Sequence, residues 1–345
     1  MTNRANQCDR RRFLRGAVAA GAAGLVGFRP ERVFAEPPPE TTKLRIGKVA
    51  AACTAPQFVA EELLRSEGFI DVQYIECETI PGLLKALAAG TTDISMVTVL
   101  PTVIRLDAGD PIVVLAGVHV GCYELFGTDR VRSIRDLKGK TVAVWELGDG
   151  EHVYISVMAA YVGLDPRKDI KWVTHPPDEA IPLLAEGKID AYMVFPPYPQ
   201  ELRAKKIGHA VVKTAVDRPW SQYFCCMALG SREFIRKNPV ATKRALRAIL
   251  KGADICALEP ERAARVVVDK GYTAYKGYTP RYDYTLQTLK ELPYGKWREY
   301  DPADTVRFAA LRLHEIGLIK SSPQKILAQS TDWRFLNELR KELKG

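Results

Sequence analysis

One local pattern occurs twice in this chain, and it constrains the fold more than any other feature. In residues 84–94 a helical stretch ends at Gly90, a short turn follows, and Asp93 leads into an apolar strand. Residues 183–191 repeat this order of helix, glycine, turn and aspartate. Glycine just past a helix is a common stop signal, and the change of period that follows it marks a strand. Two occurrences at matching places predict two lobes of the same kind.

Strands and helices alternate along both halves of the chain. The predicted strands span residues 43–50, 72–76, 93–97, 111–116, 141–144, 170–173, 189–194 and 225–229. The predicted helices span residues 56–64, 80–89, 150–161 and 177–185, and two more begin at Pro101 and Pro197. Strands separated by helices of about 10 to 12 residues indicate βαβ units and a mostly parallel sheet. After the last strand the pattern is almost entirely helical, with proline at three expected helix starts, Pro239, Pro260 and Pro302.

The first 35 residues have the composition of an export signal. Three consecutive arginines from Arg10 precede a short apolar stretch over residues 17–28, and small residues end at Ala35. This order is typical of a signal peptide, and the arginine cluster resembles the twin-arginine type. An apolar run of about a dozen residues is too short for a membrane anchor, which needs about 20. We therefore expect twin-arginine export, cleavage near Ala35 and a periplasmic location.

The charge balance excludes one class of partner. The chain carries 50 basic and 41 acidic residues, of which the predicted signal holds seven and two. The remaining 43 basic and 39 acidic residues leave a net charge of +4, which is too balanced to predict a nucleic-acid partner. About 310 mature residues suggest two domains.

Six cysteines follow the predicted signal: Cys53, Cys77, Cys122, Cys225, Cys226 and Cys256. An even number permits disulfides in an exported protein. The spacing contains neither a C-x-x-C pair nor a zinc-type arrangement of Cys and His, so we expect no metal and no cofactor. The two adjacent cysteines should alternate across their strand, one toward a cleft and one toward the core.

Four segments in this order behind a signal resemble a known family: residues 44–47, 87–94, 134–144 and 187–192. The chain is similar to the solute-binding proteins of ABC importers, of the nitrate/sulfonate/taurine and thiamine-pyrimidine-precursor type. The resemblance extends from residue 43 to about residue 258. It implies an α/β protein with the two-lobed type II periplasmic-binding-protein fold, a ligand in the inter-lobe cleft and a helical C-terminal tail on lobe one.

The resemblance also implies a domain division and a mechanism. A signal over residues 1–35 would precede lobe one, residues 43–122 plus 224–345, and lobe two would comprise residues 123–223. A monomer would capture a small-molecule ligand by lobe closure and deliver it to an ABC permease with its ATPase subunits. Independently, ligands of open α/β sheets bind beyond the carboxyl ends of strands, against helix N-termini.

Candidate ligand-binding residues come from four such loops and from the two predicted crossovers between the lobes. They are Cys53, Thr54, Gln57, Thr98, Val99, Tyr123, Glu124, Gly148, Asp149, Gly150, Glu151, His152, Phe195, Tyr198 and Cys225. Glu124 could reach the cleft floor or form a pair at the hinge. His152 could donate to a ligand, or it could cap or pack against its own helix.

The loop around Asp149 suggests the character of the ligand. In sulfonate and taurine binders this loop resembles a Gly-Ser-Ser turn that holds the anion, whereas here Asp149 and Glu151 occupy it. Two carboxylates would repel an anion, which favours a neutral or cationic heteroaromatic ligand flanked by aromatic residues. The alternative is that both acids only cap the following helix and interact with its dipole.

We expect no enzymatic activity, because the chain contains no Gly-x-Ser-x-Gly, phosphate-loop or His-Glu-x-x-His motif. Two alternatives remain open. One is a pyrimidine-precursor-synthesis enzyme on the same fold, against which the export signal argues. The other is a receptor subunit that senses the ligand, which the sequence does not separate from transport.

Overall fold

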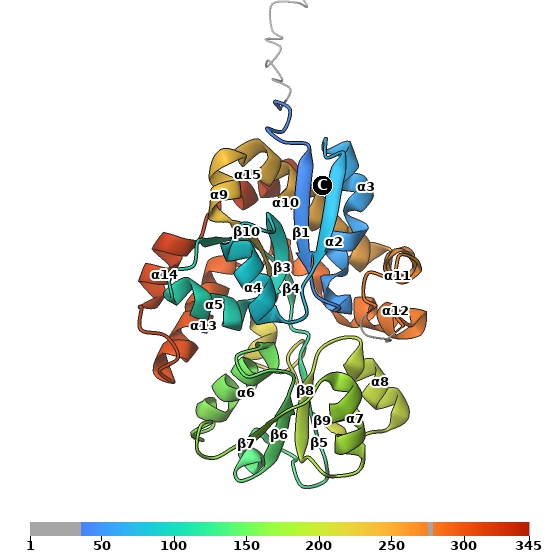
Figure 1. Ribbon diagram of the computed structural model, residues 1–345, viewed down its shortest axis with the longest axis vertical. Coiled ribbons are helices and arrows are strands. Elements are labelled where there is room, and N and C mark those ends of the chain that lie inside the picture. Colours follow the sequence, from blue (N-terminus) through green and yellow to red (C-terminus); the bar gives the residue numbers. More distant parts are fainter. Residues whose placement is uncertain (1–35, 275–278, 345) are drawn as a thin grey trace, which may run out of the picture. The chain divides into compact units, whose positions relative to one another are not determined.

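The computed structural model describes residues 36–274 and 279–344 (Figure 1). The predicted signal peptide and its cleavage site at Ala35 lie outside the described residues. Two separate five-stranded sheets, each flanked by helices, form two lobes. This confirms the predicted α/β fold class. None of the helices in the described ranges has both the length and the apolar character needed to cross a membrane.

The first sheet has the strand order β2-β1-β3-β10-β4. Its strands are β1 (Lys43–Lys48), β2 (Asp71–Glu76), β3 (Ile94–Thr98), β4 (Ile112–Val120) and β10 (Phe224–Ser231). The helices between them are η1 (Ala52–Thr54), α2 (Ala55–Val59), α3 (Glu61–Ser66), α4 (Ile80–Ala88) and α5 (Val99–Asp107). Every residue of β3, β10 and the edge strand β4 is buried, so these strands are covered on both faces.

The C-terminal third is helical, as predicted, and packs on this first sheet (Figure 1). It comprises α9 (Arg232–Lys237), α10 (Pro239–Leu258), α11 (Pro260–Asp269), α12 (Tyr282–Glu291), η4 (Tyr294–Arg298), α13 (Pro302–Glu315), α14 (Pro323–Ser330) and α15 (Arg334–Glu342). The three helices expected to begin at a proline do so. Proline is compatible with these positions because the first helical N–H has no intrahelical acceptor.

The second sheet has the order β7-β6-β8-β5-β9. Its strands are β5 (Glu124–Gly127), β6 (Thr141–Val144), β7 (Lys171–Thr174), β8 (Ala191–Val194) and β9 (His209–Lys213). The helices of this lobe are η2 (Ile134–Leu137), α6 (Gly150–Tyr161), α7 (Pro177–Ala185), α8 (Tyr198–Lys205) and η3 (Trp220–Gln222). Sheet membership is in line with the predicted division into lobes, whose residue boundaries stay a prediction.

The repeated pattern of helix, glycine, turn and aspartate has the same structure in both lobes. Gly90 and Gly187 adopt φ of +68° and +69°, a conformation that glycine reaches without steric cost. The Asp93 carboxylate accepts a 2.7 Å hydrogen bond from the amide of Arg45 in β1. The Asp190 carboxylate likewise accepts a 2.8 Å bond from the amide of Thr141 in β6. Each aspartate therefore ties the strand it precedes to the first parallel strand of its sheet.

The expectation of mostly parallel sheets is only partly met. β10 runs antiparallel between β3 and β4, and β5 runs antiparallel between β8 and β9. The reason is topological, because β10 returns from the other lobe and so enters its sheet in the reverse direction. β5 and β9 were not among the predicted strands.

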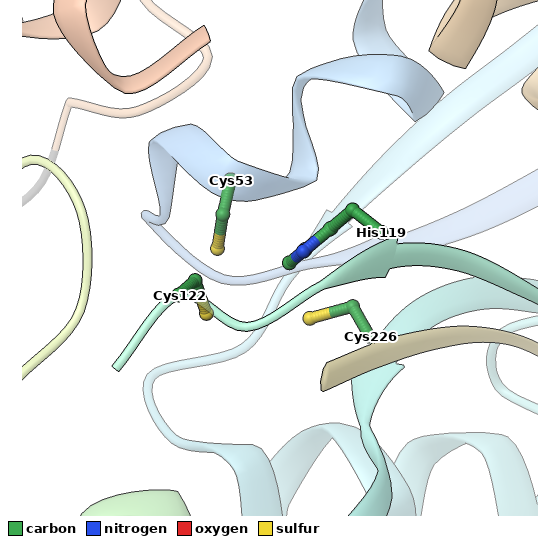
Figure 2. Close-up of side chains that lie close together, drawn as sticks. All are labelled: Cys53, His119, Cys122 and Cys226. Carbon is green, nitrogen blue, oxygen red and sulfur yellow. The ribbon is translucent and has the colours of Figure 1, made fainter. Parts of the chain in front are cut away.

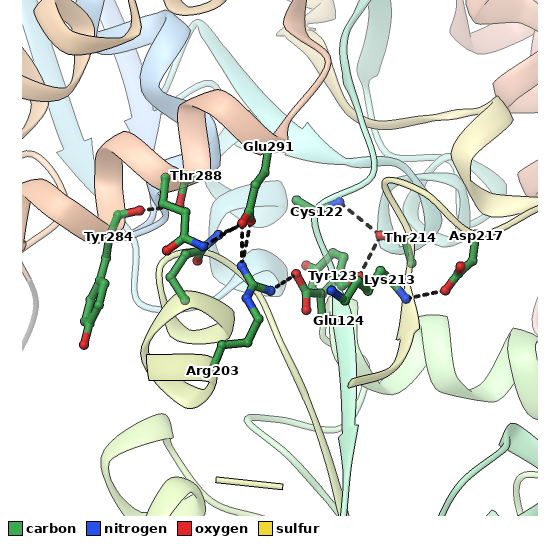
Figure 3. A network of polar contacts seen from close by, with 12 residues as sticks. Cys122, Tyr123, Glu124, Arg203, Lys213, Thr214, Asp217, Tyr284, Thr288 and Glu291 are labelled. Atoms are coloured by element: carbon green, nitrogen blue, oxygen red, sulfur yellow. Dashed lines mark hydrogen bonds and ion pairs between the residues drawn. The ribbon is translucent and has the colours of Figure 1, made fainter. Parts of the chain in front are cut away.

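Two connecting segments between the lobes are bonded to each other (Figure 3). The Thr214 hydroxyl accepts from the amide of Cys122 at 3.0 Å and donates to the carbonyl of Tyr123 at 2.8 Å. Gly121, with φ of +42°, lies against the backbone of Ala215, where an added Cβ would come within 2.3 Å. The close backbone approach requires glycine at this position.

Gly252 provides a test of the packing between α10 and α2. An alanine Cβ there would lie 2.3 Å from the carbonyl oxygen of Pro56, so we expect Gly252→Ala to lower the free energy of unfolding by about 1–3 kcal/mol. Urea denaturation of residues 36–345 followed by tryptophan fluorescence measures this. Gly82→Ala in α4 is the matched control, because its Cβ would meet its nearest neighbour at 3.5 Å. Equal midpoints for the two variants would contradict the packing argument.

Candidate functional site

A pocket lies between the two lobes, beyond the carboxyl ends of β1 and β3. Its empty volume is about 490 Å³, part of which is open to solvent. Six of the predicted binding residues line it: Cys53, Thr54, Thr98, Tyr123, Asp149 and Phe195. They come from both lobes. η1 and β3 belong to lobe one, and the loops after β6 and β8 belong to lobe two.

Gln57, Val99 and Cys225 lie beside the pocket and not in its wall. Gln57 is buried, donates to the carbonyl of Gly47 at 3.2 Å and accepts from the amide of Met96 at 3.0 Å. It therefore holds α2 against β1 and β3. Val99 and Cys225 line a separate small cavity together with Trp220.

The other predicted residues of lobe two support the wall from behind. The His152 ring accepts from the amide of Gly148 and packs edge-on against Trp172 at 4.7 Å. Tyr198 packs edge-on against Phe195. At Gly150 an added Cβ would lie 2.0 Å from the hydroxyl of Tyr123.

Several residues of the pocket wall were not among the predicted binding residues. They include Glu78, Thr79, Ile80, Met96, Trp145 and Cys226, as well as Val49, Ala50, Ala51, Val97 and Cys122. The first three follow β2, so the rule that ligands bind beyond strand ends could have found them. Cys226 could not be distinguished from Cys225, because period-two alternation shows only that the two face opposite ways.

Asp149 acts both as a helix cap and as a pocket residue. It occupies the N-cap of α6, where its side chain accepts from the amide of Gly150, and it also accepts from the Ile80 amide of lobe one at 3.4 Å. Its exposed fraction is 3%. Burial raises the pKa of Asp149 to about 6, although both hydrogen bonds act in the opposite direction.

Glu151 lies in the first turn of α6 and is fully buried. Neither of its carboxyl oxygens has a hydrogen-bond partner among the described residues. Burial, and next the negative charge of Asp149, raise the pKa of Glu151 well above its ordinary value. Burial of this kind favours the neutral form of the carboxyl group.

Several polar contacts join the lobes around the pocket, among them a 2.9 Å hydrogen bond that the Gln200 side-chain amide donates to Glu291. The Ala52 amide donates to the carbonyl of Pro196 at 3.0 Å, and the Ile80 amide donates to Asp149. Arg203 of α8 pairs with Glu291 of α12 at 2.7 Å and also with Glu124 of β5 (Figure 3). Of the two alternatives weighed for Glu124, the structure shows the pair near the hinge.

A cluster of four side chains of types that can ligate a metal lies at the lobe-one side of the pocket. One ligand atom from each of Cys53, His119, Cys122 and Cys226 lies within 4.8 Å of the others, and all four residues are buried (Figure 2). No metal-binding motif is visible in the sequence, because the four donors come from three separate segments and only His119 and Cys122 lie close together in the chain. His119 lies near the end of β4, beyond the residue at which this strand was predicted to end.

The sequence pattern of the NMT1-like family matches residues 37–268, and the chain belongs to this family. This confirms the resemblance seen in the sequence. A nitrate/nitrite binding protein, NrtA of Nostoc sp., is 20% identical over 262 residues. The match covers 68% of this chain and only 59% of that relative.

Solved structures of binding proteins share the two-lobed fold. The periplasmic nitrate-binding protein NrtA from Synechocystis PCC 6803 has a TM-score of 0.73 at 16% identity, covering 89% of this chain and 90% of that one. The alkanesulfonate-binding protein SsuA from Xanthomonas axonopodis pv. citri, bound to MOPS, has a TM-score of 0.67 at 18% identity, covering 83% and 96%. These named relatives are binding proteins, as the sequence predicts for this chain.

The raised pKa of Asp149 predicts how stability depends on pH. Between its unfolded value near 4 and its folded value of about 6, the folded protein holds a proton that the unfolded chain has lost, so stability falls as pH rises through this window. Across this window, deprotonation of Asp149 should lower the free energy of unfolding by about 2–3 kcal/mol. Urea unfolding at a series of pH values should show that Asp149→Asn removes most of this fall.

The matched control is Asp301→Asn, which changes the exposed N-cap of α13 and should retain the parent's pH profile. The raised pKa of Glu151 also makes stability fall with rising pH, and the Asp149 variant keeps the share of this fall that burial causes. An Asp149→Asn profile that follows the parent throughout the window would show that this carboxyl is not desolvated in the folded protein.

Proposed function

We propose that this protein is the extracytoplasmic solute-binding component of an ABC importer, with a neutral or cationic heteroaromatic ligand. The family and the two-lobed fold support the general class. The observation that carries the ligand class is the composition of the pocket wall. Among its described lining residues are the acidic Asp149 and Glu78, and none is lysine, arginine or histidine. A site for an inorganic anion or a sulfonate would need positive charge or converging donors.

Aromatic rings form one side of the pocket. Trp145 and Phe195 lie parallel, with ring centroids 6.1 Å apart and an interplanar angle of 4°. Tyr123 meets Phe195 edge-on at 6.2 Å. Flat apolar walls favour a flat ligand, and ring faces also attract a cation. The Asp149 carboxyl beside these rings can accept a hydrogen bond from a ring N–H or pair with a cationic group.

Capture by lobe closure follows from where the pocket lies. Its wall comes from both sheets, and the contacts from Ala52 and Ile80 cross from lobe one to lobe two. A ligand that touches both lobes binds the closed arrangement better than the open one, and this difference in affinity shifts the population toward closure. The bonded pair of connectors is suited to act as the hinge.

Delivery to a permease and its ATPase is the role that family membership suggests for a protein of this kind. The predicted twin-arginine signal and cleavage near Ala35 would place the mature chain in the periplasm as a monomer. We propose lobe one as residues 43–122 plus 224–345 and lobe two as residues 123–223. The strands of each sheet all fall within the residue ranges of one proposed lobe, which supports this division.

A binding screen of residues 36–345 tests the ligand class. Neutral and cationic heteroaromatic compounds should raise the melting temperature, since a ligand at 100 times its dissociation constant adds about 2.7 kcal/mol. Asp149→Asn should weaken the binding of a cationic ligand by at least about tenfold, because it removes the partner charge. Calorimetry measures this change. Nitrate and alkanesulfonates should give no shift. Binding of these anions alone would overturn the proposal.

Glu291→Gln tests the role of the inter-lobe ion pair. Removing the charge opposite Arg203 should weaken ligand binding about three- to tenfold, mainly through faster release, since the pair forms only when the lobes meet and is partly exposed. Stopped-flow fluorescence measures the release rate. Glu299→Gln is the control, because Glu299 pairs with Lys296 within lobe one. Equal release rates in the two variants would show that the Arg203 pair does not hold the lobes together.

A further inference from the structure

We propose that Cys53, His119, Cys122 and Cys226 form a binding site for a thiophilic metal ion, with Zn²⁺ as the expected ion. Figure 2 shows the three sulfur atoms and the imidazole ring directed toward a common space. Their ligand atoms all lie within 4.8 Å of one another. Donors of a tetrahedral zinc site with Zn–S bonds of about 2.3 Å lie about 3.8 Å apart. Shifts of about 1 Å would therefore complete the coordination.

His119 gives an independent indication of a ligand. It is fully buried, and its Nε2 atom has no hydrogen-bond partner among the described residues. Its Nδ1 atom lies 3.4 Å from the carbonyl oxygen of Val120. An Nδ1–H that donates to a backbone carbonyl leaves the Nε2 lone pair free toward the cluster, which is the usual arrangement of a metal-bound histidine. Without an ion, this buried nitrogen is left without a hydrogen-bond partner among the described residues, which is unfavourable.

The surrounding residues hold the donors in place. The Tyr294 ring packs edge-on against His119 at 5.4 Å, and the Tyr294 hydroxyl donates to the carbonyl of Cys53 at 3.1 Å. The amide of Cys122 is bound by Thr214. Rigid support of this kind from outside the donor set is what a preformed metal site needs.

The donor set selects the ion. Three sulfurs and one imidazole nitrogen match the Cys₃His composition of structural zinc sites, and soft thiolates favour Zn²⁺ or Cu⁺ over Mg²⁺ or Ca²⁺. Four protein donors fill a tetrahedral ion, so no position is left for a substrate. On binding, the ion replaces the thiol protons, which are released to solvent.

The position of the site gives it a structural role in the cleft. Cys122 lies in the connector that leaves lobe one, Cys226 lies in the strand that returns to it, and Cys53 lies in the pocket loop after β1. A bound ion would join the outgoing connector and the start of the returning strand β10 to this loop, and so fix the floor of the pocket. The inference does not depend on which organic ligand the pocket takes.

Metal binding can be measured on residues 36–345 purified with a thiol reductant, treated with chelator and then loaded with Zn²⁺ or Co²⁺. We expect one ion per chain by elemental analysis and a higher melting temperature with Zn²⁺. The Co²⁺ form should show the thiolate charge-transfer and intense visible bands of a tetrahedral site. Cys226→Ser and His119→Gln should each weaken Zn²⁺ binding by at least about tenfold.

Cys225→Ser is the matched control, because Cys225 is the adjacent buried cysteine, its sulfur lies 3.2 Å from that of Cys122, and it is outside the cluster. It should keep one ion per chain. Parent protein that takes up no stoichiometric Zn²⁺ or Co²⁺ overturns the proposal, whether or not the variants fold. So does periplasmic protein in which Cys122 is disulfide-bonded. Failure here leaves the ligand screen unaffected, because metal content is read without any organic ligand.

Discussion

The bond between the two connectors is the constraint on which the rest of the structure depends. Thr214 binds the backbone of Cys122 and Tyr123, and Gly121 allows the two segments to touch. Because both crossings run side by side, we expect the lobes to move about this line. The pocket opens beside it, and its wall therefore comes from both sheets. Tyr123 leads directly from the connector into the pocket wall.

The same constraint explains why chemically reactive groups gather at this place. β4 ends at the connector and β10 begins just after the return, so His119, Cys122 and Cys226 are brought together although about 100 residues separate the first two from the third. The loop after β1 adds Cys53. Buried polar groups of this type are costly unless they are satisfied, and a bound ion would satisfy them together.

The pocket's electrostatics differ from those expected for an anion site. Asp149 and Glu151 are buried at the start of α6, where the helix dipole favours negative charge, and yet burial raises the pKa of both. At Asp149, desolvation raises the pKa by more than the two backbone donors lower it. At Glu151, no donor among the described residues bonds to the carboxyl oxygens. The protein shares its fold with anion-binding proteins, whereas the chemistry of its pocket is set by its own side chains.

Local signals in the sequence determined the order of strands and helices. The strand at residues 141–144 and the helix at 177–185 lie where they were predicted, and the repeated glycine and aspartate mark equivalent turns in both lobes. Proline, glycine and apolar period act over a few residues, so they can be recognised without the fold. The loops that follow the strands could be named for the same reason.

Only the tertiary structure decided which side chains meet. Sheet order and the double crossing reversed β5 and β10, put Cys226 and not Cys225 in the pocket wall, and placed His119 beside three cysteines. The tertiary structure also placed Gln57 against β1 and β3, where it supports α2 beside the pocket. These outcomes depend on contacts between residues far apart in the chain, and no local period or spacing records such contacts.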